Sequence, residues 1–145
     1  MKEGLCAITG VVGGFIASLF GGWDAGLTTL IIFMGIDYLT GLIVAGVFHK
    51  SQKTKTGALE SRAGWKGLCR KCVTLLMVLV ACRLDLLIGS NFIRDAAVIA
   101  FVVNESISII ENAGLMGIPI PKVIVKGIEV LKQRSESEEK KNESD

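Results

Sequence analysis

The most informative segment of this chain lies at residues 4–23, which read GLCAITGVVGGFIASLFGGW. None of these 20 residues is charged. A helix rises 1.5 Å per residue, so a helix of about 20 apolar residues crosses the ~30 Å hydrocarbon core of a bilayer. The segment therefore predicts a membrane-spanning helix. A cleaved signal peptide is the competing interpretation, although Glu3 offsets Lys2 and no clear A-x-A cleavage site follows.

Three further apolar segments follow at residues 27–48, 72–90 and 96–113, each interrupted by charged side chains. A charge in the middle of a spanning helix costs ~2.5–3.5 kcal/mol. The segment at 96–113 has the fewest apolar residues to offset that cost. Because 50% of the 145 residues are hydrophobic, we expect an all-α polytopic membrane protein with about four transmembrane helices. The alternative is a soluble helical bundle, which the uncharged first segment disfavours.

Positive charge is concentrated in one connecting segment. Residues 49–71 carry seven basic side chains against Glu60, a net charge of +6. Cytoplasmic loops are enriched in Lys and Arg, so we expect this loop and both chain termini in the cytoplasm, with four crossings between them. A nucleic-acid site is the alternative, but no nucleic-acid module accompanies the charge, and we expect no such partner. The topology-determining residues are Lys50, Lys53, Lys55, Arg62, Lys66, Arg70 and Lys71.

The end of the chain differs in character from the transmembrane domain at residues 1–121. Glycine and proline in the stretch 114–121 predict a break after the fourth segment. In residues 122–132 the apolar side chains cluster on one helical face, which is typical of an amphipathic helix on the inner membrane surface. Residues 132–145 are charged at nine of 14 positions. This composition predicts a disordered charged tail, so 122–145 forms a second, polar region.

Small residues recur every four positions along the first segment. Small side chains allow close approach of two helices in lipid. The strip serves either packing within one subunit or packing between subunits, and the pattern alone favours neither. The candidates for helix packing or oligomerisation are Gly10, Gly14, Ser18 and Gly22.

Polar and ionisable side chains lie within the apolar segments. Such groups are costly in lipid and usually face partners or water. We expect an ion pair between Asp37 and Arg83. We also expect a polar stripe at Asn104, Ser108 and Asn112, which either lines a water-filled space or hydrogen-bonds to other helices. The full set of intramembrane candidates is Asp37, Thr40, Gly41, Arg83, Asp85, Asn104, Glu105, Ser108, Glu111 and Asn112.

The sequence contains few motifs that are typical of enzymes. The single histidine, His49, lies at a predicted membrane boundary, and the chain contains no HExxH, P-loop or GxSxG motif. Cys69 and Cys72 form one CxxC pair, whereas a structural zinc site needs four ligands. We therefore expect no enzymatic activity, no cofactor and no metal site.

Several motifs occur in an order that resembles a known family. They are DYLTG at 37–41, KS at 50–51, GWKG at 64–67 leading to Arg70 and Lys71, an apolar helix with Asp85, NESISI at 104–109 with EN at 111–112, and GIPIP at 117–121. This order resembles the phage lysis and toxin-secretion holin family of Gram-positive bacteria and their phages. The resemblance covers roughly residues 30–132.

The resemblance implies a holin that oligomerises in the bacterial (host) cytoplasmic membrane and opens lesions there. Through these lesions an endolysin reaches the cell wall, without required contact with the holin, or a toxin is released. The implied partners are the lipid bilayer, further copies of the chain and, functionally, an endolysin. The alternatives are a small channel or transporter subunit and a structural membrane anchor protein.

Overall fold

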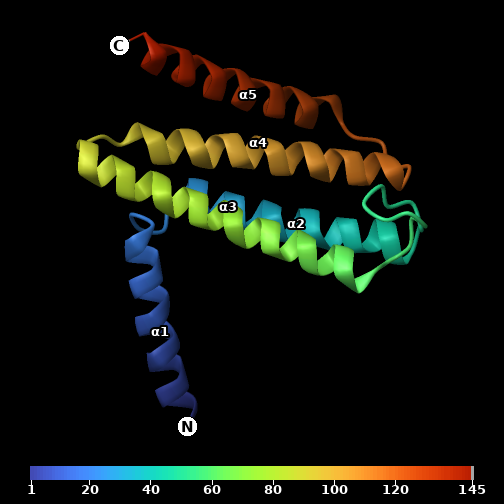
Figure 1. Cartoon of the computed structure of the whole chain (residues 1–145), viewed down its shortest axis with the longest axis horizontal. Coiled ribbons are helices and arrows are strands. Elements are labelled where there is room, and N and C mark those ends of the chain that lie inside the picture. The colour runs from blue at the N-terminus through green and yellow to red at the C-terminus, as the bar shows by residue number, and fades with distance from the viewer. Residues whose placement is uncertain (145) are drawn as a thin grey trace.

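The described part of the chain folds into five helices (Figure 1). The computed structural model describes residues 1–144. Within that range there are no strands, which confirms the expected all-α class. The helices are α1 (Lys2–Leu19), α2 (Ala25–Gly46), α3 (Ser61–Ile88), α4 (Phe92–Leu115) and α5 (Lys122–Glu143).

Helices α2, α3 and α4 form the body of the molecule, and α5 runs along the outer side of α4 (Figure 1). Helix α4 is central because it packs against α2, α3 and α5. Side chains of α2, α3 and α4 make a small core, which Leu131 of α5 contacts from outside. The buried members of this core are Leu27, Leu30, Met34, Val78, Cys82, Val98 and Val102.

Helix α1 projects away from the body of the molecule (Figure 1), and Ala17 is its single buried residue. The helix ends before a tight turn in which Gly21 and Gly22 have φ values of +77° and +95°. These left-handed values favour glycine because it has no Cβ. Helix α2 then begins at an N-cap, where the Asp24 side chain accepts a hydrogen bond from the Leu27 N–H at 2.8 Å. Gly22 therefore lies outside α1 and does not continue the predicted small-residue strip.

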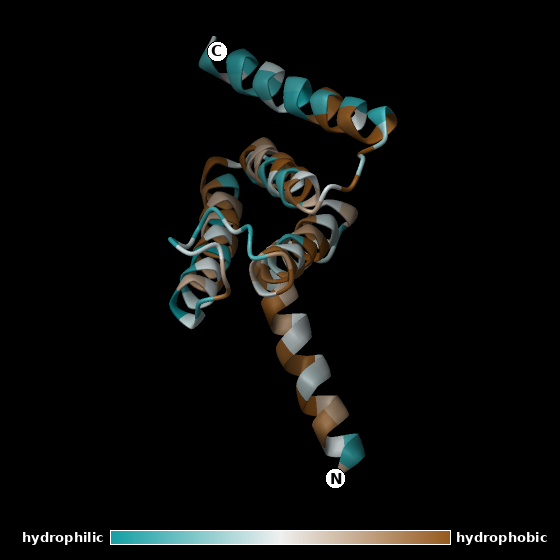
Figure 2. Cartoon of the chain, turned by 90° about the vertical axis from the view of Figure 1, so that its right-hand side faces the viewer, coloured by the Kyte–Doolittle hydropathy of each residue, from teal (hydrophilic) through white to brown (hydrophobic). Residues whose placement is uncertain are grey.

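Exposed large apolar side chains occur on each of α1 to α4. Helix α5 becomes hydrophilic toward its end (Figure 2). Leu39, Leu86 and Leu87 are among many large apolar side chains that are more than half exposed. An exposed apolar area of this extent is typical of a surface that faces lipid or other protein chains. Both α1 and α2 are long and apolar enough to cross a membrane. Helices α3 and α4 do not meet the same criterion, so composition alone does not establish four crossings.

The helix bounds correct two sequence-based predictions. The predicted basic loop 49–71 is not one loop, because α3 begins at Ser61 and the irregular connection covers residues 47–60. Helix α5 continues to Glu143, where a disordered tail is predicted. Both errors have one cause: hydropathy ends a predicted helix at its first charges, although Lys, Arg and Glu are good helix formers.

Candidate functional site

A lysine between two carboxylates is the main polar feature of the helical body. The Lys71 Nζ donates hydrogen bonds to Asp37 Oδ2 at 2.7 Å and to Glu105 Oε2 at 2.5 Å. The exposed fractions of the three side chains are 15% for Lys71, 7% for Asp37 and 8% for Glu105. One residue comes from each of α3, α2 and α4, so the ion pairs join all three helices. With both acids ionised, this group carries a net charge of −1.

Asn112 extends the ionic group toward the end of α4. Its Nδ2 donates to Asp37 Oδ1 at 3.1 Å and to Thr40 Oγ1 at 2.9 Å. The Thr40 hydroxyl in turn donates to the Asp37 carbonyl oxygen at 3.1 Å. We call Asp37, Lys71, Glu105 and Asn112 the Lys71 cluster. Each of its charged groups has a partner, which is the condition under which buried charges are tolerated.

Helical spacing explains why these side chains converge. On α4, Glu105, Ser108 and Asn112 are separated by three and then four residues, so they share one face. On α2, Gly41 lies one turn after Asp37, and a Cβ placed on Gly41 would be 3.9 Å from Asn112 Nδ2. The polar faces of α2 and α4 are therefore turned toward each other.

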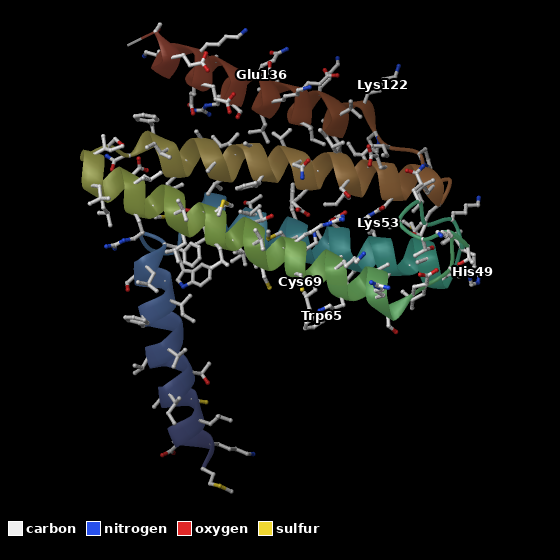
Figure 3. All side chains as sticks on the ribbon, viewed as in Figure 1. His49, Lys53, Trp65, Cys69, Lys122 and Glu136 are labelled. Carbon is white, nitrogen blue, oxygen red and sulfur yellow. The ribbon has the colours of Figure 1, made fainter. Side chains whose placement is uncertain are left out.

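A cavity of about 430 Å³ adjoins the Lys71 cluster. It lies between α2, α3 and α4 and is bordered by the connection that includes Ser51 to Thr54. Figure 3 shows this end of the molecule, where His49 and Lys53 lie. The cavity is lined by both polar and apolar side chains and is large enough to hold several waters beside its polar groups. Its charged lining residues are Asp37, Lys53, Glu60, Arg70, Lys71, Glu105 and Glu111.

The structure brings most of the predicted intramembrane candidates to this cavity. In addition to the charged residues, the cavity is lined by Gly41, Asn104, Ser108 and Asn112. Thr40 does not line the cavity but accepts a hydrogen bond from Asn112, which does. The predicted polar stripe on 104–112 therefore faces both another helix and a cavity. This arrangement supports both roles that the spacing left open.

The predicted ion pair between Asp37 and Arg83 is wrong. Asp37 pairs with Lys71, and Arg83 is exposed on α3. Lys71 and Arg83 are 12 residues apart, which is roughly 18 Å along the helix. Sequence reasoning treated Lys71 only as a topology residue in a loop. The available signal was its position as the last charge before the uncharged run 72–82.

Asp85 has a structural role at the opposite end of the helical body. Its carboxylate accepts from the Ser90 hydroxyl at 2.6 Å and from the backbone N–H groups of Ile93 and Arg94 at 3.1 and 2.9 Å. These N–H groups belong to the first turn of α4, where negative charge is favourable. Asp85 therefore holds the start of α4 against the end of α3, away from the Lys71 cluster.

Arg94 ties the start of α4 to the turn between α1 and α2. Its Nε donates to the Phe20 carbonyl oxygen at 2.9 Å, and its Nη1 donates to Asp24 Oδ2 at 2.5 Å and Asp95 Oδ1 at 3.1 Å. The guanidinium beside Asp24 holds the pKa of that carboxyl below its usual value. We call Phe20, Asp24 and Arg94 the Arg94 clasp. Sequence reasoning did not single it out, although Arg94 is one of only two basic residues between 72 and 121.

The small residues Gly10, Gly14 and Ser18 of α1 have no packing partner within residues 1–144. A Cβ added at Gly10 or Gly14 would meet no atom within 4 Å, and Ser18 is exposed. The Ser18 hydroxyl donates only to the Phe15 carbonyl oxygen, at 2.6 Å. Packing within one subunit therefore does not account for the strip in this structure.

The predicted topology residues fall into three environments. Lys50, Lys53 and Lys55 are exposed in the connection 47–60. The exposed residues Arg62, Lys66 and Arg70 lie on the first turns of α3, and Lys71 is mostly buried in the Lys71 cluster.

Among residues 1–144, no group of three or more His, Cys, Asp or Glu side chains could hold a metal ion.

The family model that matches the chain and one named relative indicate the same family. The sequence profile of the bacteriophage holin family matches residues 14–133. An uncharacterized protein of Halalkalibacterium halodurans is 38% identical over 128 residues, covering 84% of this chain and 89% of the relative. An uncharacterized protein of Listeria innocua is 34% identical over 134 residues, covering 92% and 90%. A protein of Bacillus phage phi105 named "Probable holin" is 30% identical over 118 residues, covering 81% and 82%. No solved structure matches the chain.

Proposed function

The chain belongs to the bacteriophage holin family, and from this premise we propose that it oligomerises in the bacterial cytoplasmic membrane and forms lesions there. Endolysin reaches the cell wall through these lesions without needing to contact the holin, or a toxin leaves the cell. The observation that carries the proposal is the Lys71 cluster, a fully paired charged group inside an otherwise apolar set of helices. Family membership indicates a non-enzymatic membrane protein.

The cluster supports a two-state mechanism. In the quiet state Lys71 is paired with Asp37 and Glu105, and the outer surface presents apolar side chains to lipid. In the lesion the helices separate, and the same three charges face water. Membrane potential biases such a change by ~2.3 kcal/mol per elementary charge moved through 100 mV. The strip at Gly10, Gly14 and Ser18 has no partner among the described residues, which supports packing between subunits.

We place four crossings at α1 to α4, with both termini and the connection 47–60 in the cytoplasm. The ion pairs support this topology, because charges that pair between helices do not each carry the full insertion cost of an isolated charge. The basic connection favours the cytoplasmic side. This assignment puts the Arg94 clasp and the turn after α3 at the outer surface.

Helix α5 is excluded from the bilayer in this topology. It carries 11 charged residues, and each would cost ~2.5–3.5 kcal/mol at the bilayer centre. The four-crossing topology therefore requires that α5 leaves the side of α4 along which it packs in Figure 1. Insertion of α4 moves α5 to the inner surface about the connection 116–121, where Gly117 has a φ of +75° and two prolines follow.

Expression of the chain together with a cytoplasmic endolysin tests the proposal. We expect abrupt lysis after a delay when both proteins are produced. We expect no lysis when the cytoplasmic endolysin is produced without the chain. Release of a folded cytoplasmic reporter enzyme should coincide with lysis. Membrane insertion without release of any reporter would contradict lesion formation and would favour an anchor protein.

A small channel subunit is the second candidate function. The cavity within one chain favours it, because Lys53, Asn104 and Glu111 are among the polar residues that line it. A channel would dissipate ion gradients while retaining folded enzymes. Passage of ions without release of the reporter enzyme therefore distinguishes the channel from the holin.

A further inference from the structure

One side of α3 carries a continuous exposed stripe that none of the other helices in residues 1–144 covers. Successive members are three or four residues apart, so they share one helical face. Its apolar members are 42% to 53% exposed, and its basic members are exposed as well. We call these residues the α3 outer stripe: Arg62, Lys66, Arg70, Val73, Met77, Val80 and Leu84.

The stripe changes from basic to apolar at one point along the helix. The basic part, Arg62 to Arg70, extends roughly 12 Å, and the apolar part, Val73 to Leu84, extends roughly 16 Å. One leaflet contributes half of the ~30 Å hydrocarbon core, about 15 Å. The apolar part therefore matches the length of the acyl chains of one leaflet, and the basic part matches the level of the headgroups.

The basic side chains are available to a ligand. Within residues 1–144, none of Arg62, Lys66 and Arg70 makes an ion pair. Arg70 also borders the cavity beside the Lys71 cluster, so Arg62 and Lys66 are the members that face only outward. Trp65, which is 67% exposed, points away from the helical body beside them (Figure 3). Tryptophan is enriched at the membrane–water boundary.

We propose that the α3 outer stripe binds anionic phospholipids of the cytoplasmic leaflet. Arg62 and Lys66 bind the phosphate of the headgroup, Trp65 lies at the boundary, and the apolar part contacts the acyl chains. Arginine and lysine both recognise phosphate, arginine through two parallel hydrogen bonds. The apolar continuation of the stripe favours a lipid over a nucleic acid, which offers no acyl chains. The proposal needs membrane insertion but not lesion formation, so lysis assays and lipid-binding assays can fail independently.

Fluorescence of Trp65 provides the test, because the chain contains only one other tryptophan, Trp23. The full chain with Trp23→Phe is reconstituted in vesicles of phosphatidylcholine and phosphatidylglycerol at one fixed ratio. Either the phosphatidylglycerol or the phosphatidylcholine carries brominated acyl chains, which quench nearby tryptophan. We expect stronger quenching by the brominated phosphatidylglycerol. In Arg62→Gln with Lys66→Gln, the preference should fall by up to about fivefold for each charge removed.

Lys50→Gln with Lys55→Gln is the matched control, since it removes the same charge from the exposed connection outside the stripe. We expect this variant to keep the wild-type preference. Equal quenching by the two lipids in the wild type would overturn the proposal. An equal loss of preference in both double variants would also overturn it, because diffuse attraction would then suffice. Helix content by circular dichroism, with quenching by brominated phosphatidylcholine, verifies that each variant is folded and inserted.

A labelled single-stranded oligonucleotide serves as the competitor. We expect it to leave the quenching by phosphatidylglycerol unchanged at physiological salt. The opposite result would be that the oligonucleotide displaces the lipid in the wild type but not in Arg62→Gln with Lys66→Gln. That result would identify the stripe as a nucleic-acid site and overturn the assignment to lipid.

Discussion

Replacing Lys71 with methionine should destabilise the quiet state of the protein. Methionine keeps an unbranched side chain of similar length but removes the ammonium group that contacts Asp37 at 2.7 Å and Glu105 at 2.5 Å. Both carboxylates would remain mostly buried between α2 and α4 without their cation. Breaking a buried ion pair by removing one partner costs ~3–5 kcal/mol. Since ~1.4 kcal/mol is a factor of ten, the packed arrangement should lose at least about a hundredfold in its equilibrium with an opened one.

The assay is the time from induction to lysis in cells that also produce a cytoplasmic endolysin. We expect Lys71→Met to lyse earlier than the wild type at equal amounts of protein in the membrane. Adding Asp37→Asn and Glu105→Gln to Lys71→Met should return the onset toward the wild-type time. Replacing all members of a buried ionic group by neutral ones is often neutral or stabilising.

Arg83→Gln is the matched control, because it removes one positive charge from the exposed side of the same helix. Its onset should shift far less than that of Lys71→Met, because Arg83 makes no ion pair within residues 1–144. An unchanged onset in Lys71→Met, with membrane abundance verified by immunoblot, would refute the role assigned to the cluster. An equal shift in Arg83→Gln would show that charge on α3, not the buried contact, sets the timing.

Three further predictions concern other contacts. Asn112→Leu removes the donor to Asp37 and should advance lysis less than Lys71→Met, because an unsatisfied buried acceptor costs ~1–3 kcal/mol. Arg94→Met should loosen α1, measurable as a broader spin-label distance distribution between α1 and α4. In the wild type the pKa of Asp24 is lowered, so the Arg94 clasp is intact at neutral pH and is lost as pH falls through that lowered pKa. The broadening should then appear below about pH 4, and Arg94→Met should lack this pH dependence. Gly57→Ala should lower the free energy of unfolding by more than ~1 kcal/mol, since φ at Gly57 is +74° and a Cβ would meet the His49 carbonyl oxygen. The control Gly114→Ala lies in open space on α4 and should not lower the free energy of unfolding.

The apolar helices and the polar face of α4 could be predicted from the sequence, because both depend on spacing along one segment. Asn104, Ser108 and Asn112 repeat every four residues, and the structure places them at one cavity. The partner of Asp37 could not be predicted this way. Periodicity assigns a side chain to a face, but the level at which two helices meet depends on the connection between them. The connection here is residues 47–60, not 49–71, which places Lys71 opposite Asp37.

Asp85 illustrates a different limit of sequence reasoning. Its position in an apolar segment predicts an intramembrane charge, whereas it actually caps the following helix. Gly89, with a φ of +75°, ends α3 and allows the chain to turn back within four residues. The N–H groups at the start of α4 therefore come within reach of a carboxylate on the last turn of α3. A Gly-Ser-Asn sequence four residues after an aspartate is a usable signal for such a turn.

The ion pairs also explain why α3 and α4 are less apolar than α1 and α2. A hydropathy average assigns each charge its cost within one helix, as if that helix stood alone in lipid. Lys71 and Glu105 have opposite signs and make contact at 2.5 Å, so their burial depends on the assembled helices and not on either segment. In the proposed four-crossing topology, this dependence makes α3 and α4 stable in a bilayer only while they are packed together with α2. A protein built in this way has helices that pack tightly while paired and that favour water once separated. In the proposed mechanism this combination is required, because the same charges that hold the quiet state together would line the aqueous lesion after it opens.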